Sequence, residues 1–236
     1  MRLTARAISR TLRSRANPDH APNLRRFFKT GPGEYGEGDR FVGAKLSVIR
    51  ALSRGCRRTP LAEILKLLQS PIHEGRTLAL LMLVDAFKAG DEDAKRGIYD
   101  LYLANTAFIN NWDLVDCSAG QIVGGWLRGR SAAPLTRLAR SKSLWERRIA
   151  IIATSDGIRR GEFDDTLRIA DLLLHDEHDL IHKAVGWMLR EVGHRDGARA
   201  RAFLRTRYKT MPRTMLRYAI EKFPEAERRR YLDGRI

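Results

Sequence analysis

In this 236-residue chain, four side chains stand at corresponding positions of successive helix-length segments. Together they could act on a charged partner. Trp112 and Asp116 lie on one segment, Arg148 on the next and Trp187 on the one after that. Positions three and four residues apart share one face of an α-helix, so stacked helices would direct all four side chains to one surface. That surface would combine a carboxylate, two indoles and a guanidinium, a group that suits bidentate contacts with phosphate.

The segments that carry these residues belong to a longer series with a regular period. Five segments start near Arg76, Asn111, Leu144, Asp179 and Pro212, at spacings of 35, 33, 35 and 33 residues. A period of about 34 residues is typical of the helix–turn–helix units of a stacked α-solenoid. The spacing therefore predicts a solenoid with its candidate residues on one face.

Partner helices are expected between these segments. Thr59 to Leu68 opens with a Thr cap and a Pro in the first turn, and its apolar residues recur at helical spacing. Asp164 to Leu174 has the same pattern after an acidic start. Long alternating β-branched runs are nearly absent. The expected fold class is all-α.

The N-terminal part of the chain differs from the repeats. Residues 1 to 28 are expected to form one or two basic helices, broken near Asn17-Pro18 and Ala21-Pro22. Residues 29–43 are rich in glycine and are expected to be a connector anchored by Tyr35 or Phe41. A phosphate cradle is disfavoured there, since the stretch has no GK[ST] ending and follows no strand. Helical repeats then fill residues 44–236, and a short basic helix ends the chain, so residues 1–236 are expected to be one domain.

The balance of charge indicates the kind of partner. The formal net charge is +16 and the sequence pI is about 10.6, which points to a polyanion and most often to nucleic acid. Acidic membrane surfaces, RNA–protein particles and a generally basic solvated surface are the alternatives. The chain has no run of 18 apolar residues, and its basic N-terminus lacks the apolar stretch of a secretory signal. An organelle transit peptide would look somewhat similar, but the stretch also reads as an ordinary first helix, so a cytoplasmic location is expected.

Few features of the sequence indicate a metal site or a catalytic nucleophile. Cys56 and Cys117 lie far apart in sequence and form no disulfide framework or zinc ligand set. His175, His178 and His182 alternate with acids, but those acids stand where a connection between helices needs caps. No G-x-S-x-G motif occurs. Neither a metal nor a cofactor is expected.

Each candidate residue also has a structural interpretation. Trp112 could be a core aromatic, whereas Asp116 stands in an apolar helix where burial without a role would be costly. Asp113 is expected to face away from Asp116, as a first-turn acid or as a hydrogen-bond partner of a neighbouring helix. Gly186 next to Trp187 leaves room for something to approach. Arg190 and Glu191 would form an ion pair or a capping couple.

Three motifs carry a resemblance to a known family. NNWDLVD around Trp112 and Asp116, WERRIAII around Arg148, and KAVGWMLRE around Trp187 resemble the AlkD family of DNA alkylation-repair glycosylases. Members of that family are built from HEAT-like repeats. With the period of about 34 residues, the resemblance covers roughly residues 27 to 218.

The resemblance implies removal of cationic alkylated purines, such as 3-methyladenine and 7-methylguanine, from double-stranded DNA for base excision repair. Asp116 would be the catalytic carboxylate, Trp112 and Trp187 would pack against the deoxyribose, and Arg148 would bind the backbone phosphate. No general acid is needed, because such a base departs neutral, unlike most glycoside leaving groups. The expected DNA-contacting residues on a basic concave face are Arg147, Arg148, Arg190 and Lys29.

Two alternatives stay open at the level of the sequence. A non-catalytic relative could bind damaged or branched DNA through the same repeats, although it would be expected to lose at least one of the four residues. A protein–protein scaffold of HEAT type would need an apolar or acidic groove, which the excess of arginine disfavours. A monomer without a membrane partner would satisfy every feature of the sequence.

Overall fold

The computed structural model describes residues 4–236, and helices account for all of its regular structure apart from one isolated bridge between Arg40 and Ile72. The all-α prediction is confirmed. The described chain divides into two compact units, one ending at Ser118 and the other running from Ala119 to Ile236. The prediction of a single domain over residues 1–236, with a basic concave face, stays a prediction.

The first unit begins with the basic helices that the sequence predicts. A 3₁₀ turn at Pro18–His20 separates the first two α-helices, because the Asn17 side chain accepts the Asp19 N–H and starts a new turn. The helices of this unit are α1 (Ala5–Ser14), α2 (Ala21–Phe27), α3 (Leu46–Gly55), α4 (Leu61–Leu68), α5 (His73–Ala89), α6 (Glu92–Ala104) and α7 (Trp112–Asp116), with a second 3₁₀ turn at Thr106–Phe108.

The predicted partner helix at Thr59 to Leu68 is present as α4, but its start differs from the prediction. The helix begins at Leu61, and the Thr59 hydroxyl donates to the Cys56 carbonyl instead of capping the helix. α4 and α3 both pack on α5. Leu67, Leu68 and Leu78 are almost fully buried there, and each such side chain contributes roughly 1.5–3 kcal/mol of hydrophobic stabilisation.

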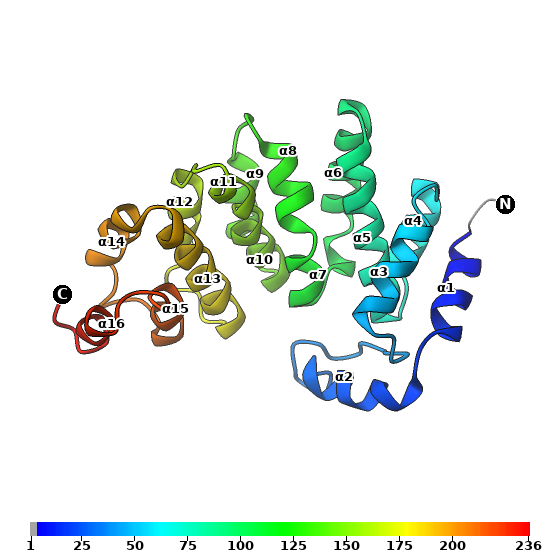
Figure 1. Cartoon of the computed structure of the whole chain (residues 1–236), viewed down its shortest axis with the longest axis horizontal. Helices are drawn as coiled ribbons and strands as arrows, with labels where there is room; N and C mark the ends of the chain where they lie inside the picture. Colours follow the sequence, from blue (N-terminus) through cyan, green and yellow to red (C-terminus); the bar gives the residue numbers. More distant parts are fainter. Residues whose placement is uncertain (1–3) are drawn as a thin grey trace. The chain divides into compact units, whose positions relative to one another are not determined.

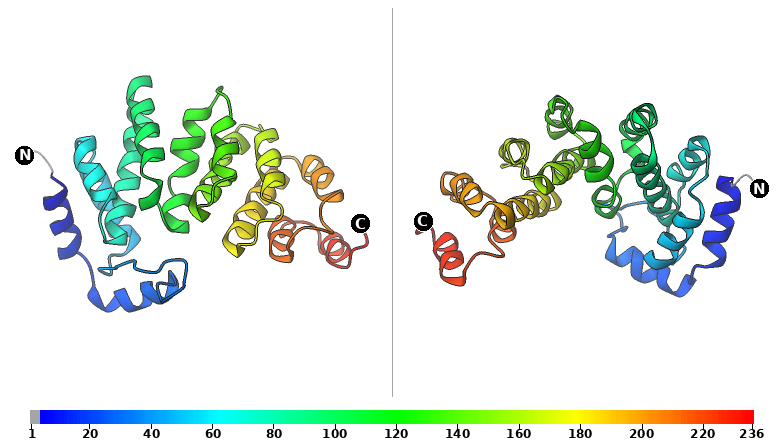
Figure 2. Two further views of the ribbon diagram at one scale, coloured as in Figure 1. Left: turned by 180° about the vertical axis from the view of Figure 1, so that it is seen from behind. Right: turned by 45° about the horizontal axis from the view of Figure 1, so that its top comes forward.

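The second unit repeats a pair of helices along the chain. α10 (Leu144–Ala153), α13 (Asp179–Arg195) and α15 (Arg213–Ala219) pack in succession, and α9 (Ala133–Ala139), α12 (Asp164–Leu172) and α14 (Gly197–Arg205) lie beside them (Figure 2). The remaining elements are a π-helical turn η3 (Gly120–Gly124), α8 (Gly125–Leu127), α11 (Ser155–Arg159) and α16 (Glu225–Leu232). The basic tail helix is therefore confirmed.

The predicted period is visible in where the helices begin. α10 and α13 begin at the predicted residues, Leu144 and Asp179, while α7 and α15 begin one residue after Asn111 and Pro212. α5 begins at His73, three residues before the predicted Arg76. The three extra residues, His73, Glu74 and Gly75, are buried, and they bring polar side chains to the N-terminal end of α5.

The glycine-rich connector crosses that same end of α5 (Figure 1). Residues 29–43 form turns and no helix, as predicted. At Gly43 the backbone has φ 85°, and a Cβ there would overlap the Asn17 carbonyl, so only glycine fits. The connector is thereby folded back against the basic N-terminal helices and delivers Asp39 and Phe41 to the interior of the first unit.

Candidate functional site

Trp112 and Asp116 lie one turn apart on α7 in the first unit. The Asn111 side chain caps this helix, its Oδ1 accepting the Trp112 N–H at 2.8 Å. Trp112 is half-buried against a small cluster of Ala21, Phe28 and Phe41, with its ring 5.3 Å from that of Phe28. The indole therefore has a packing role, and it also keeps part of its surface exposed.

Asp116 is half-buried beside two groups that the protein keeps neutral. Burial, together with the charges of Asp113 and Asp116, raises the pKa of the Cys117 thiol well above its usual range. Burial also raises the pKa of the Tyr102 hydroxyl, and the negative charge of Asp116 adds to the effect. A thiol in this state is a poor nucleophile. The role of Asp116 as the catalytic carboxylate stays a prediction.

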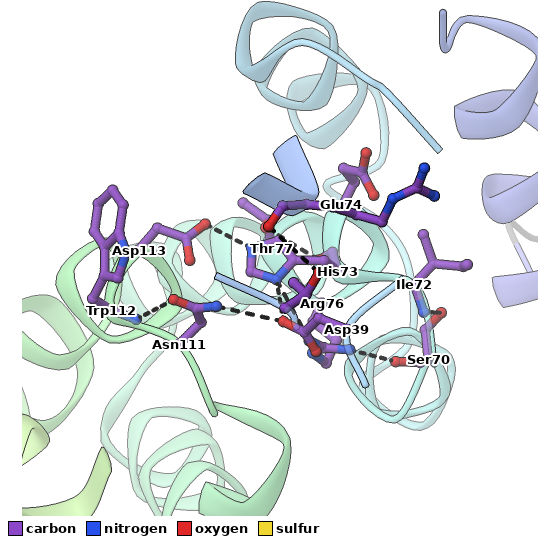
Figure 3. A network of polar contacts seen from close by, with 12 residues as sticks. Asp39, Ser70, Ile72, His73, Glu74, Arg76, Thr77, Asn111, Trp112 and Asp113 are labelled. Carbon is purple, nitrogen blue, oxygen red and sulfur yellow. Dashed lines mark hydrogen bonds and ion pairs between the residues drawn. The ribbon is translucent and has the colours of Figure 1, made fainter. Parts of the chain in front are cut away.

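Asp113 faces a neighbouring helix, as the sequence predicts. Its Oδ2 lies 2.8 Å from Nε2 of His73 at the start of α5, and Nδ1 of the same imidazole lies 2.9 Å from Oδ2 of Asp39. Arg76 donates from Nη2 to the other oxygen of Asp39 at 2.5 Å. Figure 3 shows these side chains pointing toward one another from the connector, α5 and α7. We call Asp39, His73, Arg76 and Asp113 the charged network.

The charged network is buried and its charges balance. His73 and Arg76 are only 2% and 4% exposed. Burial alone would lower the pKa of His73, but hydrogen bonds to Asp113 and Asp39 outweigh it and raise that pKa. Burial would likewise raise the pKa of Asp39, but the bonds and charges of His73 and Arg76 lower it. Two carboxylates thus face two cations near neutral pH.

A second acid at the start of α5 holds the connector. The Glu74 carboxylate accepts the backbone N–H groups of Val42, Gly43 and Ala44 at 2.8–3.1 Å. Phe41 is 8% exposed and stacks on both Phe28 and His73. Of the two predicted anchors of the connector, Tyr35 and Phe41, it is Phe41 that packs into the interior, while Tyr35 is half-buried.

Arg148 and Trp187 lie on neighbouring helices of the second unit. Arg148, on α10, is 5% exposed and donates from Nη1 to the Leu180 carbonyl of α13 at 2.5 Å. Trp187, on α13, is half-buried and donates from Nε1 to Glu191 at 3.3 Å. The structure thus brings together Trp112 with Asp116, and the helices of Arg148 and Trp187. A shared site of all four stays a prediction.

The other predicted DNA-contacting residues have partners or lie outside the second unit. Arg147 donates from Nε to Asp176 at 2.6 Å. Arg190 pairs with Glu221 and lies 3.5 Å from Glu191, so the predicted ion pair is present. Lys29 is exposed in the connector, with φ 52°. Their contacts with DNA stay predictions.

The room beside Trp187 is filled by the protein itself. A Cβ on Gly186 would meet the Met215 carbonyl and the Tyr218 side chain, both of which belong to α15. The glycine therefore lets α15 approach α13 closely. The space that the sequence predicts beside Trp187 is occupied by another helix of the protein.

A cluster of arginines surrounds Asp156 in the second unit and lies outside the predicted site residues. Arg128, Arg159 and Arg160 all contact this one carboxylate, which is 5% exposed. Burial lowers the pKa of Arg159, and the positive charges of Arg195 and Arg128 add to the effect. We call Arg128, Arg159, Arg160 and Arg195 the arginine cluster. A useful sequence signal is that Arg159 and Arg195 are the last residues of α11 and α13, and Arg128 directly follows α8.

A cavity of about 750 Å³ in the second unit lies between the loop after α8, α12 and the start of α14, and Arg160 of the arginine cluster lines part of it. None of the four candidate residues lines it. Arg160 pairs there with Glu162 and Arg199 with Asp164, while Arg130 bonds to the Trp126 carbonyl and stacks on the Trp126 ring. Among residues 4–236 no group of three His, Cys, Asp or Glu side chains is placed to hold a metal ion. His178 caps α13 by accepting the Leu180 N–H.

No helix within the described residues is long and apolar enough to cross a membrane. Two sets of polar groups in this positively charged chain are candidates for a functional role. One is the charged network next to α7, and the other is the arginine cluster at the ends of α8, α11 and α13.

Comparison with known proteins shows similarity to one family. The model of the family described as DNA alkylation repair enzyme matches residues 8–223. A solved structure described as a predicted DNA alkylation repair enzyme from Enterococcus faecalis has the same fold, with a TM-score of 0.70, 16% sequence identity, and coverage of 89% of this chain and 98% of that chain. Among curated proteins, none matches the chain.

Proposed function

The chain belongs to the family of DNA alkylation repair enzymes, and we propose that it is a glycosylase that hydrolyses the N-glycosidic bond of cationic alkylated purines in double-stranded DNA. The observation that carries the proposal is the pair of Trp112 and Asp116 on one turn of α7. A half-buried carboxylate beside a half-exposed indole matches the demands of a cationic sugar in the transition state.

The chemistry needs only one carboxylate because the substrate is already charged. A purine alkylated at N3 or N7 carries a positive charge and departs as a neutral base, so no acid has to protonate the leaving group. Asp116 stabilises the developing oxocarbenium ion and orients the attacking water. Trp112 and Trp187 pack against the deoxyribose of the lesion. Cys117 and Tyr102 remain protonated and take no part.

Arg148 is the proposed contact to the phosphate beside the lesion. It binds that phosphate in exchange for its contact with the Leu180 carbonyl. A charge-assisted, bidentate bond to phosphate is stronger than a bond to a neutral carbonyl. Arg148 would then contact phosphate only in the complex with DNA, after it leaves the Leu180 carbonyl.

The arginine cluster is proposed to bind the DNA backbone away from the lesion. Three guanidinium groups share the Asp156 carboxylate and Arg195 lies near Arg159, so positive charge exceeds negative charge locally. Arg128 and Arg159 are 60% and 48% exposed in their side chains, which leaves them accessible to phosphates. Phosphate contacts of this kind give affinity without sequence preference and weaken with salt.

Recognition is proposed to act through the backbone around the lesion, without a pocket for a flipped base. The cavity in the second unit is lined by none of the residues assigned to the chemistry. An enzyme without such a pocket is expected to tolerate bulky adducts. It is also expected to be inactive on neutral lesions such as uracil or 8-oxoguanine, since their departure needs an acid.

The test is release of 3-methyladenine and 7-methylguanine from methylated duplex DNA by wild type and by Asp116→Asn. The variant is expected to lose about 10²–10³-fold in single-turnover rate, the scale on which one preorganised electrostatic group acts, while duplex affinity stays within about twofold. Asp100→Asn is the matched control, because Asp100 is an exposed acid of the same unit. Comparable release of uracil by the wild type would refute the one-carboxylate mechanism.

A non-catalytic DNA-binding relative is the second candidate. The burial of Arg148 and the ion pair of Arg147 favour it, since structural roles alone could retain these arginines. Tight, salt-sensitive duplex binding by wild type with no base release from any alkylated substrate would select this candidate.

A further inference from the structure

His73 occupies the centre of the charged network, and its two hydrogen bonds define its protonation. Nδ1 faces the Asp39 carboxylate at 2.9 Å and Nε2 faces the Asp113 carboxylate at 2.8 Å. Ionised carboxylates only accept hydrogen bonds, and a neutral imidazole has one N–H. Both nitrogens can donate only if the ring is an imidazolium. The second oxygen of Asp39 is bonded to Arg76, which keeps that carboxylate ionised.

Within residues 4–236, three charged side chains contact the His73 ring. Asp39 faces it from the connector, Asp113 from α7, and Arg76 from its own helix at 3.5 Å. Glu74, the next residue, directs its carboxylate to the backbone N–H groups of the connector. The Phe28 and Phe41 rings stack on each other and both lie against the imidazole, with centroid distances of 4.8 and 4.7 Å to it.

Two contacts connect His73 with the helix that bears Trp112 and Asp116. The first is the bond to Asp113, the second residue of α7. The second runs through Phe28, whose ring also lies 5.3 Å from that of Trp112. Figure 3 shows His73 between the connector and α7, with Asp113 and Asn111 directed toward it and toward Asp39 respectively.

α7 needs such contacts because it is too short to hold its own orientation. It contains five residues, Trp112 to Asp116, and helices of this length are unstable without tertiary packing. Rotation of the helix about its axis would move Trp112 and Asp116 together, since they share one face. A bond from Asp113 to a buried, fixed ring opposes that rotation.

We infer that His73 and Asp39 are positioning residues, and that the imidazolium between Asp39 and Asp113 sets the orientation of Trp112 and Asp116. The inference rests on the proposed glycosylase function for its effect on rate. It also assigns a role to the glycine-rich connector, which supplies both Asp39 and Phe41 to the imidazolium.

The inference makes the orientation of α7 dependent on pH. When His73 loses its second proton, only one of the two carboxylates can keep its hydrogen bond to the ring. Asp39 stays paired with Arg76, whereas the half-buried Asp113 carboxylate loses the bond that joins α7 to His73. The turn that carries Trp112 and Asp116 is then released. Base release should fall at alkaline pH with the midpoint at which His73 titrates, above the ordinary histidine range.

The first experiment follows the protein itself and requires no activity. Histidine ring signals and the indole N–H signal of Trp112, assigned with Trp112→Phe, are recorded by NMR between about pH 5 and pH 10. The Trp112 signal is expected to shift with the same midpoint as His73, and Asp113→Asn should move both midpoints to lower pH, because a neutral amide stabilises the imidazolium less. A Trp112 signal that does not follow His73 overturns the inference.

The second experiment measures single-turnover base release across the same pH range. His73→Gln is expected to lower the maximal rate about 10- to 100-fold, the scale of a small misplacement of catalytic groups, and to abolish the alkaline midpoint, with substrate affinity within about twofold. His175→Gln is the matched control, since His175 is exposed in the second unit. A His73→Gln enzyme that retains the alkaline midpoint contradicts the inference.

The outcomes separate this inference from the proposed function. A Trp112 signal that follows His73 in a protein without base release supports the positioning and rejects the glycosylase. Base release with a Trp112 signal indifferent to His73 rejects the positioning and supports the glycosylase. If His73→Gln does not fold, Asp113→Asn supplies the shift in midpoint that decides the question.

Discussion

The two units of this protein use the same kinds of charged side chain in opposite ways. In the first unit, two carboxylates meet an imidazolium and a guanidinium, and all but Asp113 are almost fully buried. In the second unit, the single carboxylate of Asp156 meets three guanidinium groups whose side chains are 26–60% exposed. One set is balanced and enclosed, and the other carries an excess of positive charge at the surface.

The charged network is suited to holding a geometry, whereas the arginine cluster is suited to binding a polyanion. Buried opposite charges favour a single arrangement, because losing one partner leaves an unpaired charge in the interior. Exposed like charges contribute little to stability, but they retain attraction for phosphate. We therefore expect changes in the charged network to alter stability and rate, and changes in the arginine cluster to alter affinity.

The largest effect is expected from Asp39→Ala in the charged network. Removing this carboxylate leaves His73 and Arg76 buried without their shared partner, which should lower the free energy of unfolding by about 3–5 kcal/mol. Denaturant unfolding at pH 7 measures the change. Asp156→Ala is the counterpart in the second unit and should cost less, because its exposed arginines can turn to water. Equal losses in the free energy of unfolding for the two variants would contradict the distinction between the charged network and the arginine cluster.

A smaller effect on binding is expected from replacing Arg128, Arg159 and Arg195 together by Gln. Duplex affinity should fall by about 10- to 100-fold at moderate salt, and the slope of log affinity against log salt should decrease by up to about 3, near one for each lost phosphate contact. Fluorescence anisotropy with an undamaged duplex measures both. Thermal unfolding serves as the control and should change little, and an unchanged salt slope would exclude the cluster from the DNA interface.

The pH dependence of stability sharpens the comparison further. The raised pKa of His73 means that its contribution is complete below about pH 6.5, the unfolded value, and is lost as pH rises through the folded pKa. The lowered pKa of Asp39 means that its contribution is present above its unfolded value and is lost as pH falls through the folded pKa. Unfolding in urea at several pH values should therefore show a decline at both ends, and His73→Gln should remove the alkaline decline alone.

The smallest effect is expected from Glu162→Gln at the edge of the arginine cluster. Glu162 pairs with Arg160, and its side chain is 66% exposed, so its loss should change stability by less than about 1 kcal/mol. The same substitution removes a negative charge next to the cluster and should raise DNA affinity slightly. A loss of affinity would show that Glu162 organises Arg160 for binding.

The regular part of the fold could be read from the order of residues alone. Apolar residues at helical spacing and caps such as Ser143 and Asp91 are local signals, and they place the starts of α10 and α6. The period of about 34 residues follows from the same pattern. Asp113 could be directed toward a neighbouring helix because its position relative to Asp116 is a matter of helical phase.

The partner of Asp113 could not be read in this way. His73 lies 40 residues before it and Asp39 lies 34 residues before His73. The second spacing equals the repeat period in number, but Asp39 stands in the connector and not on a repeat helix, so the period does not predict the contact. The start of α5 was expected at Arg76, which left His73 and Glu74 outside the helix and unremarked. Asp156 has both kinds of neighbour. Arg159 and Arg160 follow it by three and four residues, which is a local signal, whereas Arg128 reaches it only after α8 and α11 have packed.

The helical class, the repeat period, the excess of positive charge and the spacing of Trp112, Asp116, Arg148 and Trp187 can all be read from the order of residues. They are properties of composition and of spacing within single helices, which depend on local interactions. Which charges are balanced and which remain available becomes visible in the folded chain. That distinction depends on burial and on contacts between residues far apart in the chain, because a charge is stabilised or left unpaired by the groups that folding brings to it.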